Sequence, residues 1–268
     1  MSETNLRFHG DAPFRVAVVH GGPGAAGDMV PVARRLATHC GVLEPHQTAR
    51  TIAGQVEELR DIICRNARIP AVLIGHSWGA WLSLLVAAQH PALVEKLILV
   101  SSGPFTEAHA DTIRARRLAR LDEGQRVEYE TTVACLRGLA TPDTHRLLTR
   151  LRRLTARSDA YAPLSWLETL REHARPVEPN SEIYQAVWSE ASEMRRRGGL
   201  MRRARFIKCP VVAIHGDSDP HPAIGVSEPL STTLADFRFV TLERCGHIPW
   251  LERYAKKEFY RVLLAEIG

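Results

Sequence analysis

The sequence predicts an α/β fold in which a mostly parallel central sheet is flanked by helices and carries an inserted helical cap. Short, almost continuous apolar runs, such as FRVAVV at 14–19 and LILV at 97–100, alternate with stretches whose apolar residues recur at helical spacing. Strands of this composition are typical of a parallel sheet that helices cover on both faces. Between residues 104 and 205 such runs disappear, and the chain becomes helical in pattern and rich in arginine.

Each expected strand is an apolar run that stops at glycine, proline or a polar turn. Thr51 precedes an apolar stripe of helical period and is a candidate N-cap. The expected elements are strands at 14–19, 70–74, 97–100, 211–214 and 237–242, at most a brief strand at 41–43, and helices at 28–39 and 51–67, after Ser77 to about Gln89, and at 255–267.

The chain is long enough, at 268 residues, to form one large core with an inserted subdomain. We expect residues 1–103 and 206–268 to form that core. Residues 104–205 are predicted to form the helical cap, which interrupts the core between its third clear strand and the strand at 211–214.

The composition is that of a globular protein, with 45% hydrophobic and 24% charged residues. The net charge is +5, but 30 acidic residues accompany 35 basic ones, so we expect interleaved surface charge. No nucleic-acid-binding motif is present, and the basic run at 195–205 is interpreted as an exposed helix end and linker.

Five widely spaced cysteines argue against a disulfide framework and a zinc site. Without an apolar leader or an apolar run of about 18 residues, we expect a cytoplasmic protein with neither a nucleic-acid nor a membrane partner. Its oligomeric state is left open.

Ser77 lies in GHSWG, a G-x-S-x-G pattern that follows an apolar run and opens a helical one. A very sharp strand-to-helix turn would strain the serine backbone, and side chains two residues away would clash, which explains Gly75 and Gly79. The hydroxyl would then stand above the sheet at a helix N-terminus, where developing negative charge is favoured. The pattern therefore makes Ser77 a candidate nucleophile.

Three other segments supply the groups that such a serine needs. HGGPG at 20–24 ends the strand at 14–19, and the N–H groups of Gly22 and Trp78 would form an oxyanion hole. GDSD at 216–219 ends another strand with carboxylates, and His247 follows the strand at 237–242. The chain order serine, aspartate, histidine differs from that of the two well-known serine-protease arrangements.

Together these motifs resemble the α/β-hydrolase fold superfamily, over most of residues 14–103 and 206–268. HGGPG with GHSWG is most similar to the branch that contains prolyl aminopeptidases and related esterases and lactonases. The resemblance implies Ser77 as nucleophile, Asp219 as the acid and His247 as the general base. Asp219 is favoured over Asp217 because the acid of the family usually lies three residues after the glycine of this turn. This chemistry requires no metal and no organic cofactor.

The chain departs from that branch after the strand at 41–43. A D-x-R-G-x-G-x-S-like loop is usual there, but the shortened segment CGVLEPHQTARTI lacks it. This puts close substrate analogies in doubt. The short N-terminus also leaves little room for the usual opening hairpin.

Several residues have both a functional and a packing interpretation. His76, Trp188 and Trp250 are candidates for the substrate pocket, although packing also explains them. His221 is a rival base with an awkward reach, two residues after Asp219. A substrate amine would need carboxylates such as Glu182, Glu190 and Glu193, which otherwise lie on a solvated helix face.

Three functions are compatible with these residues. The first is a serine hydrolase that acts on a small carboxylic ester or related acyl compound. The second is an aminopeptidase of the prolyl type. The third is a hydrolase-like protein that binds a small molecule without turning it over, and a lyase on the same scaffold is a further alternative.

Overall fold

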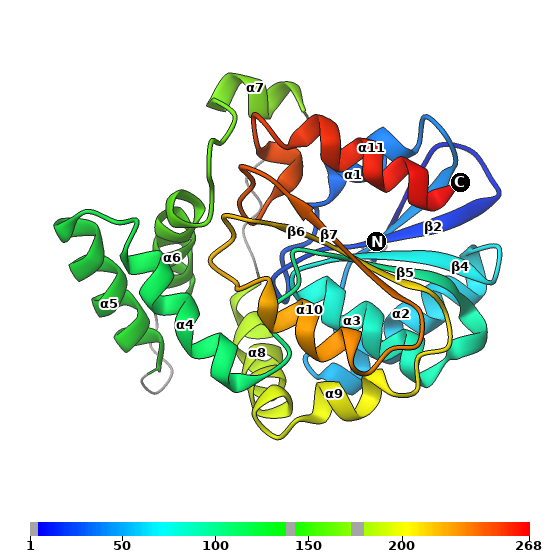
Figure 1. Cartoon of the computed structure of the whole chain (residues 1–268), viewed down its shortest axis with the longest axis horizontal. Coiled ribbons are helices and arrows are strands. Elements are labelled where there is room, and N and C mark those ends of the chain that lie inside the picture. The colour runs from blue at the N-terminus through cyan, green and yellow to red at the C-terminus, as the bar shows by residue number, and fades with distance from the viewer. Residues whose placement is uncertain (1–4, 138–142, 173–179) are drawn as a thin grey trace.

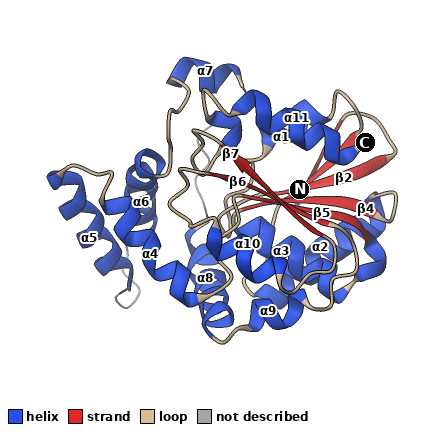
Figure 2. Cartoon of the chain, in the orientation of Figure 1, coloured by secondary structure: helices blue, strands red, loops and turns tan. Residues whose placement is uncertain are grey.

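The computed structural model describes residues 5–137, 143–172 and 180–268, which contain a seven-stranded sheet (Figures 1 and 2). The strands lie in the order β1-β3-β2-β4-β5-β6-β7, with β1 antiparallel to β3 and all other neighbours parallel. Their bounds are β1 Leu6–His9, β2 Phe14–Val19, β3 Gly41–Pro45, β4 Ala71–His76, β5 Val94–Val100, β6 Val211–Gly216 and β7 Phe237–Leu242. The predicted, mostly parallel sheet is confirmed.

Helices cover both faces of the sheet, with α2, α3 and α10 on one side and α1 and α11 on the other (Figure 1). Side chains alternate between the two faces: Ala17 and Val19 of β2 pack with α2 and α3, whereas Val16 and Val18 pack with α1 and α11. Both faces are apolar, which explains the continuous runs in the sequence. These helices are α1 Val30–Leu36, α2 Ile52–Asn66, α3 Trp78–Gln89, α10 Ile224–Ser231 and α11 Lys256–Ile267, with 3-10 turns at Pro91–Leu93 and Pro249–Leu251.

The amino-terminal edge of the sheet differs from the prediction. β3 spans five buried residues instead of three, and β1 pairs with it from Leu6 opposite Pro45 to His9 opposite Val42. Room for an opening strand therefore exists. The full length of β3 was not predicted because Glu44 lies within this strand and its charge interrupts the apolar pattern. The buried Glu44 carboxylate is partnered by His9, whose Nε2 lies 2.8 Å away.

Six helices lie between β5 and β6 in the residues that the structure describes. α8 and α9 contribute Val187, Leu200 and Ala204 to the same hydrophobic cluster as α3, whereas α4, α5 and α6 stand away from the sheet (Figure 1). The division of the chain into a core, residues 1–103 and 206–268, and a cap, residues 104–205, stays a prediction. The bounds of the six helices are α4 Glu107–Leu118, α5 Glu123–Arg137, α6 Thr144–Ser158, α7 Trp166–Arg171, α8 Ser181–Arg196 and α9 Gly199–Ala204.

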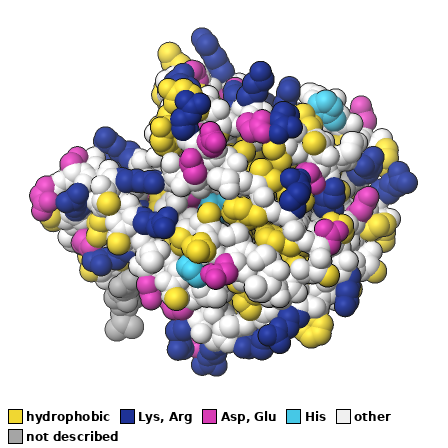
Figure 3. Space-filling model, in the orientation of Figure 1, with side chains coloured by type: hydrophobic (Ala, Val, Ile, Leu, Met, Phe, Trp, Pro, Cys, Tyr) yellow, Lys and Arg dark blue, Asp and Glu magenta, His cyan; other side chains and the backbone are white. Residues whose placement is uncertain are grey.

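Lys and Arg side chains are spread over the face drawn in Figure 3 and are interleaved with Asp and Glu, as expected. The basic run at 195–205 ends α8 and forms α9. Arg195 in it is not an exposed linker residue, because its guanidinium lies 2.8 Å from the Glu107 carboxylate and over the Trp81 ring. None of the helices within the described part of the chain combines the length and apolarity needed to cross a membrane.

Replacing Thr51 by alanine should lower the free energy of unfolding by about 1 kcal/mol, because α2 loses its N-cap. The Thr51 hydroxyl accepts a hydrogen bond from the Gly54 N–H at 3.0 Å. Urea unfolding followed by circular dichroism measures the change. Thr51→Ser keeps the hydroxyl and should unfold like the wild type. Equal unfolding midpoints for Thr51→Ala and Thr51→Ser would contradict the capping role.

Candidate active site

Ser77 occupies a sharp turn between β4 and α3. Its φ of 52° and ψ of −111° fall in a region that residues with a side chain rarely adopt. A Cβ on Gly75 would lie 2.2 Å from the Gly79 carbonyl oxygen, and a Cβ on Gly79 would lie 2.2 Å from that of Val19. The turn therefore requires glycine on both sides of Ser77, as the sequence predicts.

The side chains of Ser77, His247 and Asp219 form one hydrogen-bonded chain. His247 Nε2 lies 3.1 Å from Ser77 Oγ, and His247 Nδ1 lies 2.7 Å from Asp219 Oδ2. An ionised carboxylate only accepts, so Nδ1 carries the hydrogen and Nε2 can accept from the serine hydroxyl. Burial alone would raise the pKa of Asp219, but the His247 and His221 imidazoles hold it well below its ordinary value. Asp219 is therefore ionised, and its charge orients His247.

Asp217 has a different role in the same turn. Its carboxylate oxygens accept hydrogen bonds from the backbone N–H groups of Arg244, at 3.0 Å, and Cys245, at 3.2 Å. It thus ties the turn after β6 to the loop that carries His247. Asp217 therefore faces the backbone of this loop, whereas Asp219 faces His247.

Gly22 and Trp78, the predicted oxyanion donors, both line the cavity at Ser77. Gly22 has a φ of 41°, and Trp78 is the first residue of α3, where backbone N–H groups have no partner within the helix. The Trp78 indole turns inward and donates from Nε1 to Gln55 Oε1 at 3.0 Å. A contact between Trp78 and an oxyanion would therefore come from its backbone N–H rather than from its ring.

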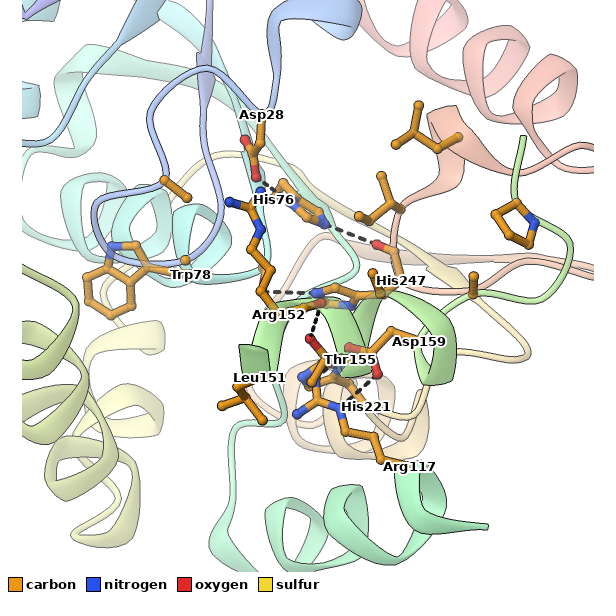
Figure 4. Close-up of a pocket in the computed structure, with 18 of the residues that line it drawn as sticks. Asp28, His76, Trp78, Arg117, Leu151, Arg152, Thr155, Asp159, His221 and His247 are labelled. Carbon is orange, nitrogen blue, oxygen red and sulfur yellow. Dashed lines mark hydrogen bonds and ion pairs between the residues drawn. The ribbon is translucent and has the colours of Figure 1, made fainter. Parts of the chain in front are cut away.

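A cavity of about 380 Å³ opens at Ser77, between the core loops and the helices that follow β5 (Figure 4). Its size is within the range of small-molecule sites. Much of the wall is apolar and consists of Ala25, Leu148, Leu151, Ala156, Pro163, Leu164, Trp188, Ile248 and Leu251.

Two of the three pocket candidates, His76 and Trp188, line this cavity. The Trp188 ring stacks on Trp81 of α3, with centroids 6.2 Å apart and the planes 2° from parallel. Contrary to the expectation from sequence, Trp250 is not among the residues of the wall. Its ring is buried and packs edge-on against His76, with centroids 4.7 Å apart.

Five charged residues of the described cavity wall were not predicted from the sequence: Asp28, Arg117, Arg152, Asp159 and Glu252. Arg117 of α4 binds Asp159 through two hydrogen bonds of 2.7 and 2.6 Å. Figure 4 shows the Arg152 side chain running from α6 toward Asp28 and His76. None of the five lies in a recognisable motif, because they come together only through folding.

Glu252 joins the helical region to the loop of His247. The buried Glu252 carboxylate accepts hydrogen bonds from the backbone N–H groups of Gly246, Tyr161 and Ala162, at 2.9, 2.8 and 2.7 Å. The His247 N–H itself donates to the carbonyl oxygen of Asp159 at 2.7 Å. Residues 159–162 therefore help to position the catalytic candidate His247, although they belong to the region expected to be the cap.

The side chains of His20 and His215 are both buried. Burial lowers the pKa of each below the ordinary value of 6.5. His20 is fully paired as a neutral ring, because Nδ1 donates to the Gly21 carbonyl at 2.9 Å and Nε2 accepts from the Gln47 N–H at 3.3 Å. Both rings are therefore uncharged at neutral pH.

His221 reaches Asp219 without difficulty, unlike the expectation from sequence. Its Nδ1 lies 2.8 Å from Asp219 Oδ1, and its ring stacks on that of His247, with centroids 4.3 Å apart. Ligand atoms of Asp219, His221 and His247 all lie within 4.8 Å of one another. The hydrogen bonds among these three residues account for the cluster without a metal ion.

An ordered serine, histidine and aspartate at the carboxyl edge of a helix-flanked parallel sheet define the class of α/β hydrolases. Comparison with known proteins agrees, since residues 16–259 match the model of the alpha/beta hydrolase family. The chain belongs to this family.

Named relatives include esterases and lipases. The pimeloyl-[acyl-carrier protein] methyl ester esterase of Nitrosomonas europaea is 23% identical over 224 residues, which cover 82% of this chain and 81% of that protein. Monoacylglycerol lipase ABHD6 of Bos taurus is 24% identical over 208 residues, 77% of this chain and 58% of the lipase. The crystal structure of VinJ superposes with a TM-score of 0.67 at 19% identity, over 98% of this chain and 93% of that one. The last likeness concerns the fold alone.

The free energy of unfolding should fall when the pH is lowered from 7.5 to 5.5. His20 and His215 bind protons near pH 6.5 in the unfolded chain but at lower pH in the folded protein, so acid favours the unfolded state. The loss should reach up to about 3 kcal/mol for two histidines and be complete below both folded pKa values.

Urea unfolding at the two pH values measures this loss, and His20→Gln should reduce it because one of the two groups is gone. A free energy of unfolding that is the same at pH 5.5 and 7.5 would contradict the neutral, buried state of both rings.

Proposed function

We propose that the protein is a serine hydrolase that cleaves a small carboxylic ester, or a related acyl compound, through an acyl-enzyme on Ser77. The observation that carries this proposal is the chain of hydrogen bonds from Ser77 through His247 to Asp219 beside an apolar cavity. The esterase and lipase relatives support it.

His247 would take the hydroxyl proton as Ser77 Oγ attacks the acyl carbon, because a neutral hydroxyl is a poor nucleophile. Asp219 would stabilise the imidazolium that forms and keep Nδ1 protonated. The N–H groups of Gly22 and Trp78 would bind the oxyanion, each contributing about 3 kcal/mol in the transition state.

His247 would then donate its proton to the leaving alcohol. Water would attack the acyl-enzyme by the same steps, with His247 again as the base, and release the acid. Every proton in this cycle moves through a side chain of the chain itself, so the mechanism requires no metal or organic cofactor.

The cavity wall favours an apolar acyl group. Leu148 and Leu151 of α6 face the same space as Trp188 of α8, with Ile248 and Leu251 from the loop of His247. An aliphatic or flat acyl chain would replace water on these surfaces and gain about 25 cal/mol per Å² of apolar area.

The aminopeptidase alternative has less support. Glu182 pairs with Arg50, Glu190 Oε2 accepts from the Ile52 N–H at 2.8 Å, and Glu193 pairs with Arg196. None of these three carboxylates is in the described wall of the cavity, so they offer no site for a substrate amine. The cytoplasmic location, the absence of a nucleic-acid partner and the non-catalytic and lyase alternatives stay hypotheses.

Ser77→Ala should lower the turnover of p-nitrophenyl acetate by about 10⁴-fold or more and abolish labelling by a fluorophosphonate, because both reactions need the Oγ nucleophile. Ser83→Ala is the matched control, since it removes a hydroxyl of α3 that has no partner among the described residues. Ser83→Ala should keep full activity. Labelling of Ser77→Ala at the wild-type rate would refute the assignment.

Leu151→Trp should shift the substrate preference toward short acyl chains, because the larger side chain fills part of the cavity. In the wild type each methylene buried in the cavity should raise kcat/KM about fourfold, from about 0.8 kcal/mol of transfer free energy. A series of p-nitrophenyl esters from acetate to octanoate measures this, with Leu167→Trp on the exposed face of α7 as the control.

Proline 4-nitroanilide should be cleaved far more slowly than the esters, and the reverse order would favour the aminopeptidase.

A further inference from the structure

The Asp219 carboxylate serves two imidazoles, one on each oxygen. Oδ2 accepts from His247 Nδ1 at 2.7 Å, and Oδ1 accepts from His221 Nδ1 at 2.8 Å. The mechanism proposed above uses only the first of these contacts. His221 also lines the cavity beside His247 (Figure 4), so a second histidine belongs to the same centre.

The surroundings of His221 fix its tautomer and its place. Since an ionised carboxylate can only accept, His221 Nδ1 must carry a hydrogen. The backbone N–H of His221 donates to the same Oδ1 at 2.9 Å, and His215 Nε2 donates to the His221 carbonyl oxygen at 2.8 Å. The His221 ring thus has a fixed orientation, and its planar face lies against the His247 ring, 28° from parallel.

His221 is not placed as the base. The Ser77 hydroxyl hydrogen-bonds to His247, whose Nε2 is 3.1 Å from Oγ. What His221 does hold is the far oxygen of Asp219. A carboxylate bonded on one oxygen alone could rotate about its Cβ–Cγ bond, whereas bonds to both oxygens define the plane in which Oδ2 meets His247.

We propose that His221 is a positioning residue of the catalytic centre, whose Nδ1–H holds Asp219 Oδ1 so that Oδ2 faces His247. This inference rests on the proposed function. It assigns His221 no contact with the substrate and no proton transfer.

Other charged groups also face this pair of histidines. On the core side these are Asp219, His215 and His76, and on the opposite side Asp159 with its partner Arg117, and Arg152 of α6. They are unchanged in single variants at position 221. A shift in the pH profile of such a variant therefore arises from the contacts of residue 221 itself, with Asp219 and with the His247 ring.

Two replacements separate the hydrogen bond from the ring. His221→Phe keeps a flat ring against His247 but has no donor, and His221→Asn loses the ring but offers an amide N–H close to the position of Nδ1. His221→Phe should lower kcat for p-nitrophenyl acetate about tenfold, with KM nearly unchanged. The loss is moderate because the backbone N–H of residue 221 still binds Oδ1. Its acidic limb of kcat/KM should move to higher pH, since a carboxylate with fewer donors holds the His247 proton more tightly.

His221→Asn should recover most of kcat and the wild-type pH profile, and His39→Asn, at an exposed histidine, should leave both unchanged. Wild-type kinetics in His221→Phe, or an equal loss in His221→Asn and His221→Phe, would overturn the inference. Thermal unfolding verifies the fold of each variant, and His221→Leu replaces His221→Phe if the latter does not fold.

A readout without turnover separates this inference from the proposed function. The downfield proton resonance of His247 Nδ1–H should shift in His221→Phe and return in His221→Asn. An unchanged resonance in both variants would overturn the role of His221. Failure of the wild-type protein to hydrolyse any ester would overturn the proposed function, while the resonances would still decide the contact between His221 and Asp219.

Discussion

The strained backbone at Ser77 sets the geometry on which the rest of the site depends. A positive φ at Ser77 turns the chain from β4 into α3 at this single residue. The close backbone contacts of Gly75 and Gly79 leave no room for a side chain at either position. The same contacts bring the start of α3 against the end of β2, since Gly79 touches the Val19 carbonyl. The loop that contains Gly22 follows directly. One close backbone approach thus places the serine, the helix N-terminus and the glycine loop together.

The histidine side of the site is assembled by hydrogen bonds to carboxylates. Asp217 holds the loop before His247, Asp219 holds the imidazole, and Glu252 holds Gly246 against residues 161 and 162. Each carboxylate accepts at least two hydrogen bonds, so none is a buried charge without partners. The apolar cavity lies beside these polar networks. The apolar surface that could bind a substrate therefore adjoins the polar groups that could act on it.

The strands of the sheet and the turn at Ser77 were predictable from the sequence, because each is encoded in one short segment whose residues suit only one local geometry. The same holds for the segments that carry Asp219 and His247, and their order along the chain could be read directly. Contacts between distant segments were not predictable. β1 and the full length of β3 were missed because a buried glutamate, Glu44, takes a histidine partner from another strand. The pairs of Arg117 with Asp159 and of His221 with Asp219 depend on how loops fold over one another. Trp250 flanks a motif in sequence but is buried against His76 and is not among the residues that line the cavity.

The hydrogen bonds of residues 159–162 have a consequence for protein engineering. These residues lie within the predicted cap, residues 104–205, yet they hold the loop of His247 through the Asp159 carbonyl and the Glu252 carboxylate. A chimera that takes residues 104–205 from another hydrolase would lose hydrogen bonds that support the loop of the proposed general base, His247. A graft of the predicted cap should therefore keep residues 159–162 native.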